Sequence, residues 1–414
     1  MSKLRPVRGT RDLLPEDCRR HGRVVEATRS VAERYGYAEI ATPIFEFTEV
    51  FTRTLGESSD VVRKEMYTFT DRGGDEITLR PEYTGGVARA LISGGLSRQL
   101  PLKFHCHGPM FRYERPQKGR LRQFHQIDVE ILGVAESLAD IEVIAVGAHI
   151  LEELGLLEKT RLEVNSLGDP ASRAAYRAVL VDYLEPFRDR LSEDSRVRLQ
   201  RNPLRILDSK DEQDQRILER VPLIEDHLNA ASADFFAAVC EGLDELGIRY
   251  TVNPRLVRGL DYYTHTAFEF ITDALGAQGA VIAGGRYDGL VEALGGSPTP
   301  AVGWAGGIER LAMLLDAAPP APRPLVVIPV GAAARGPALR LAQDLRHEGF
   351  AVELGYSGNV TKRMKRANKL NARAAILIGE EELARATVTL RDLDTGVQAE
   401  VPLGQLGDRL APYR

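Results

Sequence analysis

The sequence predicts an α+β protein of two domains, and three observations support this fold class. The chain has 414 residues, which is more than one compact domain usually holds. A proline-rich stretch at residues 317–324 interrupts it. Paired strands and helices are expected before this stretch, and short strands that alternate with helices are expected after it. A hydrophobic content of 43% is enough for a core in each domain.

The first predicted domain spans residues 1–316. From about residue 165 to about residue 250 the pattern changes to charged helical segments, which predicts a helical insertion within this domain. Outside the insertion, helices are expected at 16–35, 140–154 and 307–315, and strands at 41–45, 102–112, 123–132, 267–271 and 279–283.

The second predicted domain spans residues 325–414, after a linker at 317–324. Four of the eight linker residues are prolines, which stiffen the backbone and remove hydrogen-bond donors. Alternating elements predict an α/β domain with a mostly parallel sheet and a hairpin turn at 394–396. The expected strands lie at 325–330, 351–354, 374–378, 387–393 and 397–403, and the helices at 337–347 and 359–371.

The second of these helices concentrates positive charge. Residues 359–373 contain no acid, although the whole chain has a net charge of −5. An isolated basic run is usually a solvated helix face, but a concentrated basic face also suits contacts with nucleic-acid phosphates. The basic side chains are Lys362, Arg363, Lys365, Arg366, Lys369 and Arg373.

The segment at 111–130 carries the clearest chemical signal. Pro116 and Gly119 predict a loop between two antiparallel strands. Side chains alternate across a strand, so Ile127, Val129 and Ile131 face a core while Gln126, Asp128 and Glu130 form a polar row beside Arg112. Such a face is often simply solvated. The loop favours a binding site instead, because it crowds four like charges into eight residues: Arg115, Lys118, Arg120 and Arg122.

Cysteine usage and the N-terminus indicate a soluble protein of a reducing compartment. Cys18, Cys106 and Cys240 are odd in number and far apart, which argues against a disulfide framework or a thiolate zinc site. No secretory signal follows Met1, and no apolar run approaches a membrane span. We therefore expect a cytoplasmic protein without a membrane segment.

Several motifs together resemble the class II aminoacyl-tRNA synthetases. Arg112-x-Glu114 with its basic loop and returning strand is similar to motif 2 of that class, residues 37–57 to motif 1 and residues 303–310 to motif 3. The stretches at 8–15, 256–264 and 283–290 resemble the histidyl-tRNA synthetase family, and Arg-Gly-Leu-Asp-Tyr-Tyr at 258–263 is the most specific. This resemblance implies a catalytic domain with an antiparallel sheet and a helical insertion, followed by an α/β anticodon-binding domain.

The resemblance also implies the reaction and its substrates. L-histidine would be activated with ATP to histidyl-adenylate and transferred to the 3′ end of tRNA-His by a homodimer, with Mg²⁺ on the ATP phosphates. The histidine carboxylate is already ionised, so the chemistry needs positioning and cations rather than a general base. The implied catalytic residues are Arg112, Arg258 and Arg310, which with Glu114 and Arg120 would also bind ATP.

Other roles follow from the same resemblance. Histidine would be bound by Glu82, Thr84, Gln126, Glu130, Tyr262, Tyr263 and Tyr287. Transfer RNA would be contacted by Arg115, Lys118, Lys362, Arg363, Lys365 and Arg366.

Alternatives remain open at this point. Glu82 follows Pro81 and would suit the start of a helix, Tyr262 and Tyr263 would suit a core, and Asp128 has no assigned role. Tyr83 stands where many family members have glycine. A non-catalytic histidine-sensing regulatory subunit, or a class II synthetase for proline or threonine, would share part of the pattern. A metal site is not expected in the hairpin, because neighbouring strand residues point to opposite faces: His105, Cys106, His107 and His125.

Overall fold

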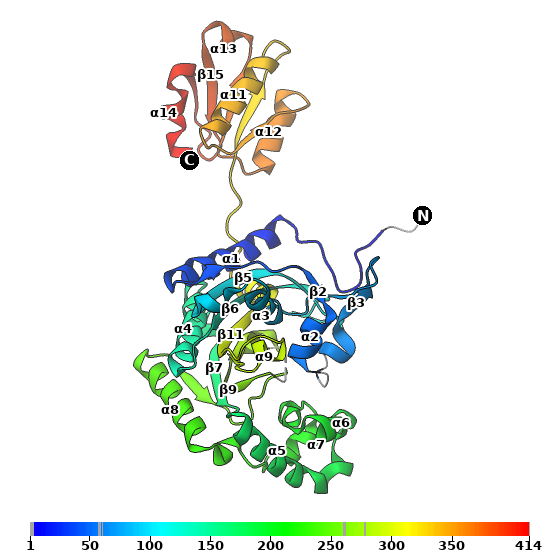
Figure 1. Cartoon of the computed structure of the whole chain (residues 1–414). Coiled ribbons are helices and arrows are strands. Elements are labelled where there is room, and N and C mark those ends of the chain that lie inside the picture. The colour runs from blue at the N-terminus through cyan, green and yellow to red at the C-terminus, as the bar shows by residue number, and fades with distance from the viewer. Residues whose placement is uncertain (1–3, 57–58, 60, 260–261, 277–278, 414) are drawn as a thin grey trace. The chain divides into compact units, whose positions relative to one another are not determined.

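The computed structural model describes residues 4–56, 59, 61–259, 262–276 and 279–413. Glu57 at the end of the motif 1 stretch, and Leu260 and Asp261 within the run at 256–264, lie outside the described residues. The chain forms two compact units, Met1–Pro319 and Pro320–Arg414 (Figure 1). Each unit has its own hydrophobic core.

A sheet of eight strands is the centre of the first unit. Five pairings in its interior are antiparallel, and the short strand at each edge pairs in parallel, so the predicted antiparallel-dominated sheet is confirmed. In spatial order the strands are β1 (Ala38–Glu39), β5 (Leu102–Phe111), β6 (Gln123–Leu132), β11 (Ala301–Gly307), β10 (Ala280–Arg286), β9 (Thr264–Ile271), β7 (Arg161–Ser166) and β8 (Tyr250–Val252).

Helices cover the apolar face of this sheet. Ile127, Val129 and Ile131 of β6 are buried there, as their alternation in the sequence predicts. Trp304 on β11 is also buried in this core and donates its indole N–H to the Val143 carbonyl at 2.8 Å. The covering helices are α1 (Pro15–Arg34), α4 (Ser137–Glu153), α8 (Ala230–Glu245) and α10 (Ile308–Leu314).

The polar face of β6 is also covered by other parts of the chain, so it is buried. Gln126, Asp128 and Glu130 are 8%, 0% and 0% exposed, so the face is not solvated. The residues around 80–84 and helix α3 (Thr84–Ser93) lie over it, because Thr84 donates a hydrogen bond to Glu130. Further elements on this side are α2 (Thr48–Leu55), α9 (Leu290–Ala293) and a three-stranded sheet of β2 (Phe45–Phe47), β4 (Glu76–Leu79) and β3 (Tyr67–Thr70).

Two expectations for the first unit need correction. No strand spans 41–45: β2 begins only at Phe45, because Pro43 has no N–H to donate to a ladder. Strands β7 and β8, which flank the helical segment, were not expected at all. They are short and lie at one edge of the sheet.

The segment between β7 and β8 is helical, with a small core of its own. Asp169, Ser192, Asp211 and Asn229 cap its helices with side-chain oxygens that accept backbone N–H groups. Besides α8, it contains α5 (Pro170–Leu184), α6 (Glu193–Arg201) and α7 (Glu212–Leu218).

The second unit is an α/β domain with a mixed sheet. The sequence predicted a mostly parallel sheet, but only the first three strands are parallel, because the hairpin after the third adds two antiparallel strands. The strand order is β13 (Val352–Leu354), β12 (Leu325–Pro329), β14 (Ala374–Ile378), β15 (Thr387–Asp392) and β16 (Gln398–Pro402). The helices are α11 (Arg335–His347), α12 (Val360–Lys369), α13 (Glu380–Ala384) and α14 (Leu406–Leu410). Among all the described helices, none combines the length and apolar character that crossing a membrane requires.

Candidate active site

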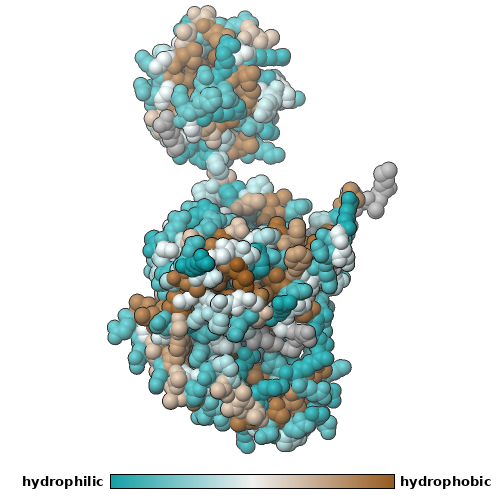
Figure 2. All heavy atoms as spheres, in the orientation of Figure 1, coloured by the Kyte–Doolittle hydropathy of each residue, from teal (hydrophilic) through white to brown (hydrophobic). Residues whose placement is uncertain are grey.

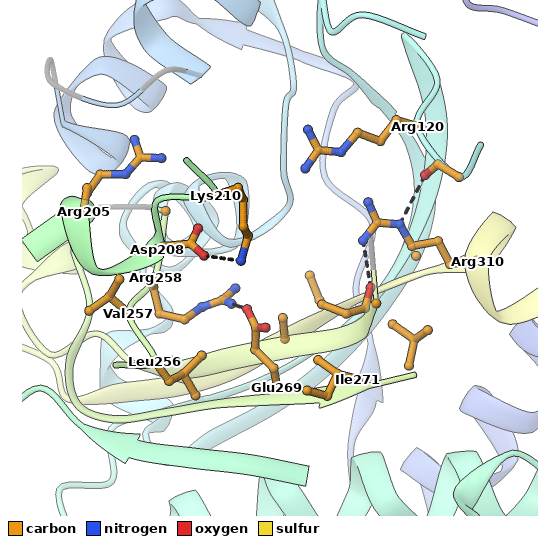
Figure 3. A pocket seen from close by; sticks show the side chains of 18 of the residues that line it. Arg120, Arg205, Asp208, Lys210, Leu256, Val257, Arg258, Glu269, Ile271 and Arg310 are labelled. Atoms are coloured by element: carbon orange, nitrogen blue, oxygen red, sulfur yellow. Dashed lines mark hydrogen bonds and ion pairs between the residues drawn. The ribbon is translucent and has the colours of Figure 1, made fainter. Parts of the chain in front are cut away.

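A cavity of about 1260 Å³ opens on the polar side of the large sheet. Its walls come from β6, β9, β10 and β11, from the loop between β5 and β6, and from the helical segment between β7 and β8. Guanidinium groups point into the cavity from two opposite sides (Figure 3). Arg205 and Arg258 lie on one side, and Arg120 and Arg310 lie on the other. Segments far apart in the sequence therefore bring several guanidinium groups into one cavity, together with the acids Glu114, Asp208 and Glu269.

Arg112 and Arg310 are held in the cavity wall by backbone carbonyls. The Nε of Arg112 donates to the Pro81 carbonyl at 2.9 Å, and the Nε and Nη1 of Arg310 donate to the carbonyls of Gly119 and Ala280 at 3.2 and 2.7 Å. Burial, with Arg120 and Arg112 nearby, lowers the pKa of Arg310. Carbonyl dipoles orient a guanidinium without neutralising its charge, so both cations remain available to an anion.

Arg258 lies at the opposite side of the cavity with a carboxylate partner. Its Nη1 donates to Oε1 of Glu269 on β9, and its guanidinium lies 5.2 Å from the centre of the Tyr263 ring. Its Nε is buried with no hydrogen-bond partner in the described part of the chain. Burial raises the pKa of Glu269, and the nearby Arg258 offsets part of that rise. An arginine with an unused N–H group can still donate a hydrogen bond to a second oxygen ligand.

The basic loop divides into an inward and an outward part. Arg120 points into the cavity and pairs with Glu114 at 2.9 Å, and Glu114 also lies 4.0 Å from Arg112. Arg115 and Lys118 are exposed and do not line the cavity. Therefore Arg120, which is proposed to bind ATP, faces the cavity. Arg115 and Lys118, which are proposed to contact transfer RNA, face solvent.

Glu130 is the buried centre of the other end of the site. Thr84 donates its hydroxyl to Oε1 of Glu130 at 2.6 Å, and the Tyr287 hydroxyl donates to Oε2. Burial raises the pKa of Glu130 to about 8. Thr84 lines the cavity, whereas Glu130 and Tyr287 do not and are fully enclosed.

Glycine at position 303 makes room for this carboxyl group. Gly303 on β11 is directly opposite Glu130 on β6, and an added Cβ would lie 1.7 Å from its Oε2 and 2.5 Å from the Val129 carbonyl oxygen. Any side chain at 303 would therefore displace Glu130. This close approach is a physical reason for glycine at the start of the 303–310 stretch.

Other proposed histidine-binding residues line the cavity next to this group. The Oε1 of Gln126 is buried with no hydrogen-bond partner in the described structure, so it is an available acceptor. The rings of Tyr262 and Tyr263 lie 4.5 Å apart, and that of Tyr262 meets Tyr287 edge-on at 5.6 Å. Glu82 accepts the Gly85 N–H at 2.8 Å, so it caps the first turn of α3 and lines the cavity as well.

Asp128 lies between Gln126 and Glu130 but is enclosed by the protein. It is 0% exposed, and neither carboxyl oxygen has a hydrogen-bond partner among the described residues. Burial, together with Glu130 and Glu82, raises its pKa well above the usual range. Asp128 therefore lies behind the cavity wall and is not part of it.

Several cavity residues were not predicted from the sequence, among them Glu269, Arg205, Asp208 and Lys210. Glu269 is the lone acid in the apolar strand segment 267–271, and that isolation was the signal that could have revealed it. Arg205, Asp208 and Lys210 come from the helical segment, and Lys210 pairs with Asp208 at 2.9 Å. Their place in the cavity depends on how that segment folds back, and no local pattern signals it.

The basic helix of the second unit is α12. Lys362 and Lys365 are exposed, whereas Arg366 pairs with Glu353 at 2.8 Å and Arg363 donates to the Pro329 carbonyl. The lysines therefore offer more freely available charge than the two arginines.

Oxygen donors for a magnesium ion are present in the cavity. Mg²⁺ typically takes one or two carboxylates and fills its other positions with water and substrate phosphates. The carboxylates of Glu269 and Glu114 both line the cavity that Arg310 faces, and this donor set fits a nucleotide-bound magnesium ion.

Comparisons with known proteins agree along the whole chain. The family model described as histidyl-tRNA synthetase matches residues 9–311, and the one described as anticodon binding domain matches residues 325–411. A histidine–tRNA ligase of Rhodospirillum rubrum is 60% identical over 100% of both chains, and one of Gluconacetobacter diazotrophicus is 56% identical over 100% of this chain and 99% of its own. The crystal structure of the apo histidyl-tRNA synthetase of S. aureus superposes with a TM-score of 0.82 at 35% identity, covering 98% of this chain and 99% of that one.

These matches span both units and include every stretch whose residues meet in the cavity. The expected resemblance is therefore confirmed: the chain belongs to the histidyl-tRNA synthetase family.

Proposed function

We infer that this chain is a histidine–tRNA ligase, which activates histidine with ATP and transfers it to tRNA-His. The observation that carries the inference is one cavity that is lined both by Arg112, Arg258 and Arg310 and by Glu82, Tyr262 and Tyr263. Relatives named histidine–tRNA ligase match the chain over its full length. A histidine-sensing regulatory subunit would need neither the three arginines nor the anticodon-binding unit, so the ligase is favoured.

The proposed reaction has two steps. A carboxylate oxygen of histidine attacks the α-phosphorus of ATP, a new O–P bond forms, and pyrophosphate leaves with the electron pair of the broken bond. A hydroxyl at the 3′ end of the transfer RNA then attacks the acyl carbon of histidyl-adenylate, and AMP leaves. In the first step two anions meet, so the main barrier is electrostatic.

The arginines lower that barrier from fixed positions. Arg112 would hold the α-phosphate, Arg310 the γ-phosphate, and Arg258 would bridge the α-phosphate and the histidine carboxylate. Backbone carbonyls already orient Arg112 and Arg310, so little reorganisation is needed when charge develops. Glu114 and Arg120 would complete the ATP site. Mg²⁺, held by the phosphates with Glu269 or Glu114, would supply further neutralisation of the leaving pyrophosphate.

The substrate histidine would lie across the wall between Glu82 and Glu130. Glu82, Thr84 and Gln126 would hold its ammonium and carboxylate end, and Glu130 and Tyr263 would meet the two ring nitrogens. Tyr262 and Tyr287 would enclose the ring. Because Glu130 already accepts hydrogen bonds from Thr84 and Tyr287, its orientation is fixed before the imidazole arrives. A site of this kind discriminates strongly against side chains that leave its buried groups unpaired.

Transfer RNA would contact two separate surfaces. Arg115 and Lys118 of the exposed loop would meet the acceptor end, and Lys362, Arg363, Lys365 and Arg366 on α12 would meet the anticodon arm. Exposed lysines suit phosphate contacts. We also propose that residues from about 165 to 250 are an insertion in the catalytic domain, 1–316, and that 317–324 link it to the anticodon-binding domain, 325–414.

A homodimer in the cytoplasm is the proposed working form. The motif 1 stretch and its sheet expose large apolar side chains, Ile44, Phe45, Phe47 and Phe69, at 44%, 55%, 59% and 46%. Apolar surface shows as brown patches among the teal on this unit (Figure 2). Exposed apolar groups of this kind suit burial against a second copy. Cys18, Cys106 and Cys240 are free thiols, in keeping with a reducing compartment.

Histidine-dependent exchange of labelled pyrophosphate into ATP tests the proposal. Exchange is expected with histidine and not with proline or threonine, and it should be lost in Arg112→Gln. Arg249→Gln is a matched control, because this arginine is exposed and pairs only with Glu158 on the surface. Absence of exchange with histidine in the wild-type protein would exclude the ligase.

A further inference from the structure

A cluster outside the proposed substrate contacts gathers three potential metal ligands. His21 on α1, His125 on β6 and Glu309 on α10 each place one ligand atom within 4.8 Å of the others. These residues come from three distant parts of the sequence. The neighbours of His125 along the strand point to the opposite face, whereas α1 and α10 bring His21 and Glu309 to the same side as its ring.

His125 and Glu309 form a rigid pair. The backbone N–H of His125 donates to Oε2 of Glu309 at 2.9 Å, and its ring Nδ1 lies 2.8 Å from Oε1. The carboxylate is therefore turned toward the imidazole and fixed from two sides. Such an oriented donor pair loses little freedom when it binds a cation.

His21 faces this pair without a hydrogen bond of its own. Its side chain is 8% exposed, and its Nε2 is buried with no partner among the residues that the structure describes. Its ring meets that of His125 edge-on, with centres 5.5 Å apart. A buried imidazole nitrogen without a partner costs free energy, so an additional ligand would stabilise it.

We propose that His21, His125 and Glu309 bind a divalent transition-metal ion, with zinc as the best match. Two imidazole nitrogens and one carboxylate oxygen form a donor set that zinc uses in proteins, with a fourth position left for water. Zinc bonds of about 2.0–2.2 Å place two ligands roughly 3.3 Å apart, so the longest separation in the cluster must shrink by up to about 1.5 Å, and the His125–Glu309 pair at 2.8 Å must open by about 0.5 Å. The ion would replace the proton between His125 and Glu309, and that proton would pass to solvent.

An ion can reach the cluster from solvent, and once bound it would connect three elements of the catalytic unit. Glu309 lines the cavity, and the His125 side chain is 25% exposed, so an ion has an entry path. Bound there, it would join α1, β6 and α10. Glu309 directly precedes Arg310, so the ion would also fix the start of the helix that presents this arginine.

Zinc binding to the full-length chain tests the proposal. The protein is stripped with a chelator, dialysed against Zn²⁺, and its metal content is measured, and Co²⁺ is added separately to record the absorption spectrum of a four-coordinate site. One equivalent of zinc is expected in the wild type and in His149→Ala, a control histidine outside the cluster. His21→Ala should bind at least tenfold more weakly, and His21→Cys should restore binding, since a thiolate is also a zinc ligand.

Two outcomes would overturn the proposal. The first is a wild-type chain that retains no stoichiometric zinc. The second is equal zinc affinity in the wild type and His21→Ala. Circular dichroism and histidine-dependent pyrophosphate exchange of the stripped variants check that they are folded, and the binding result does not depend on their activity.

Discussion

Replacement of Gly303 by alanine probes the histidine end of the site without removing any proposed contact residue. The new Cβ would lie 1.7 Å from Oε2 of Glu130 and 2.5 Å from the Val129 carbonyl oxygen. Ordinary contact needs about 3.4 Å, so the Glu130 carboxyl must shift by roughly 1.7 Å or the strands must separate. A shift of that size breaks both of its hydrogen bonds, from Thr84 and from Tyr287.

The expected loss can be estimated from these two bonds. At about 1 kcal/mol each, they correspond to a histidine affinity roughly 30-fold weaker. Crowding of the strand pair should also lower the free energy of unfolding by about 1–3 kcal/mol. The KM for ATP in pyrophosphate exchange should change less than the KM for histidine, because the atoms nearest to the new Cβ belong to Glu130 and Val129 and not to the proposed ATP-binding residues.

Gly289→Ala is the matched control for this experiment. Gly289 has an ordinary φ of −89°, and an added Cβ would meet nothing within 4 Å. Titration calorimetry with histidine and the KM for histidine in the exchange assay measure the effect. A folded Gly303→Ala protein with the histidine affinity of the wild type would refute the assignment of Glu130 to the pocket.

Further substitutions test separate parts of the structure. Arg258→Ala should abolish pyrophosphate exchange but keep measurable histidine binding, and full activity would remove Arg258 from the mechanism. Arg286→Met should lower the free energy of unfolding in urea by about 3–5 kcal/mol, because it leaves the fully buried Asp140 unpaired, and Arg286→Met/Asp140→Leu should recover much of it. Folding raises the pKa of Glu130 from its usual 4.5 to about 8, so the proton is held more tightly in the folded state. Its stabilising contribution is complete below about pH 4.5 and is lost as the pH rises through 8; urea titrations across this window should show the wild type losing stability relative to Glu130→Gln. Lys362→Gln/Lys365→Gln should weaken tRNA-His binding and reduce its salt dependence by roughly 0.7–0.9 per lost phosphate contact, and an unchanged slope in filter binding would contradict the α12 contact.

Local patterns in the sequence predicted much of the first unit. The alternation in 123–132 placed Ile127, Val129 and Ile131 in the core, and β6 has the expected bounds. The same alternation left the opposite face undecided between solvent and a site. Only the coverage by the residues around 80–84 decides it, and that coverage depends on contacts distant in the sequence.

The hydrophobic periodicity of the sequence does not show which distant residues meet in the site. Tyr287 reaches Glu130 because β10 pairs with β11 and β11 with β6, and strand order is not encoded in any single segment. Glu269 was missed although it is the lone acid in its apolar segment, and Arg205 and Lys210 were missed because their place in the cavity depends on how the helical segment folds back. Resemblance to a family supplied Arg258 and Arg310, whereas their partners, Glu269 and the carbonyls of Gly119 and Ala280, became visible only in three dimensions.

The distribution of charge in the cavity explains how one cavity can bind both the triphosphate of ATP and the imidazole of histidine. Burial raises the pKa of Glu130 to about 8 and that of Asp128 well above its usual range, which weakens the repulsion that these acids exert on a carboxylate nearby. At the other end, carbonyl oxygens hold Arg310 without cancelling its charge. A triphosphate is therefore attracted to the arginine end, and an uncharged imidazole can enter the other end without meeting a strong field. Replacing Arg310 should consequently affect ATP affinity far more than histidine affinity, and a variant in which both affinities fell equally would contradict this separation.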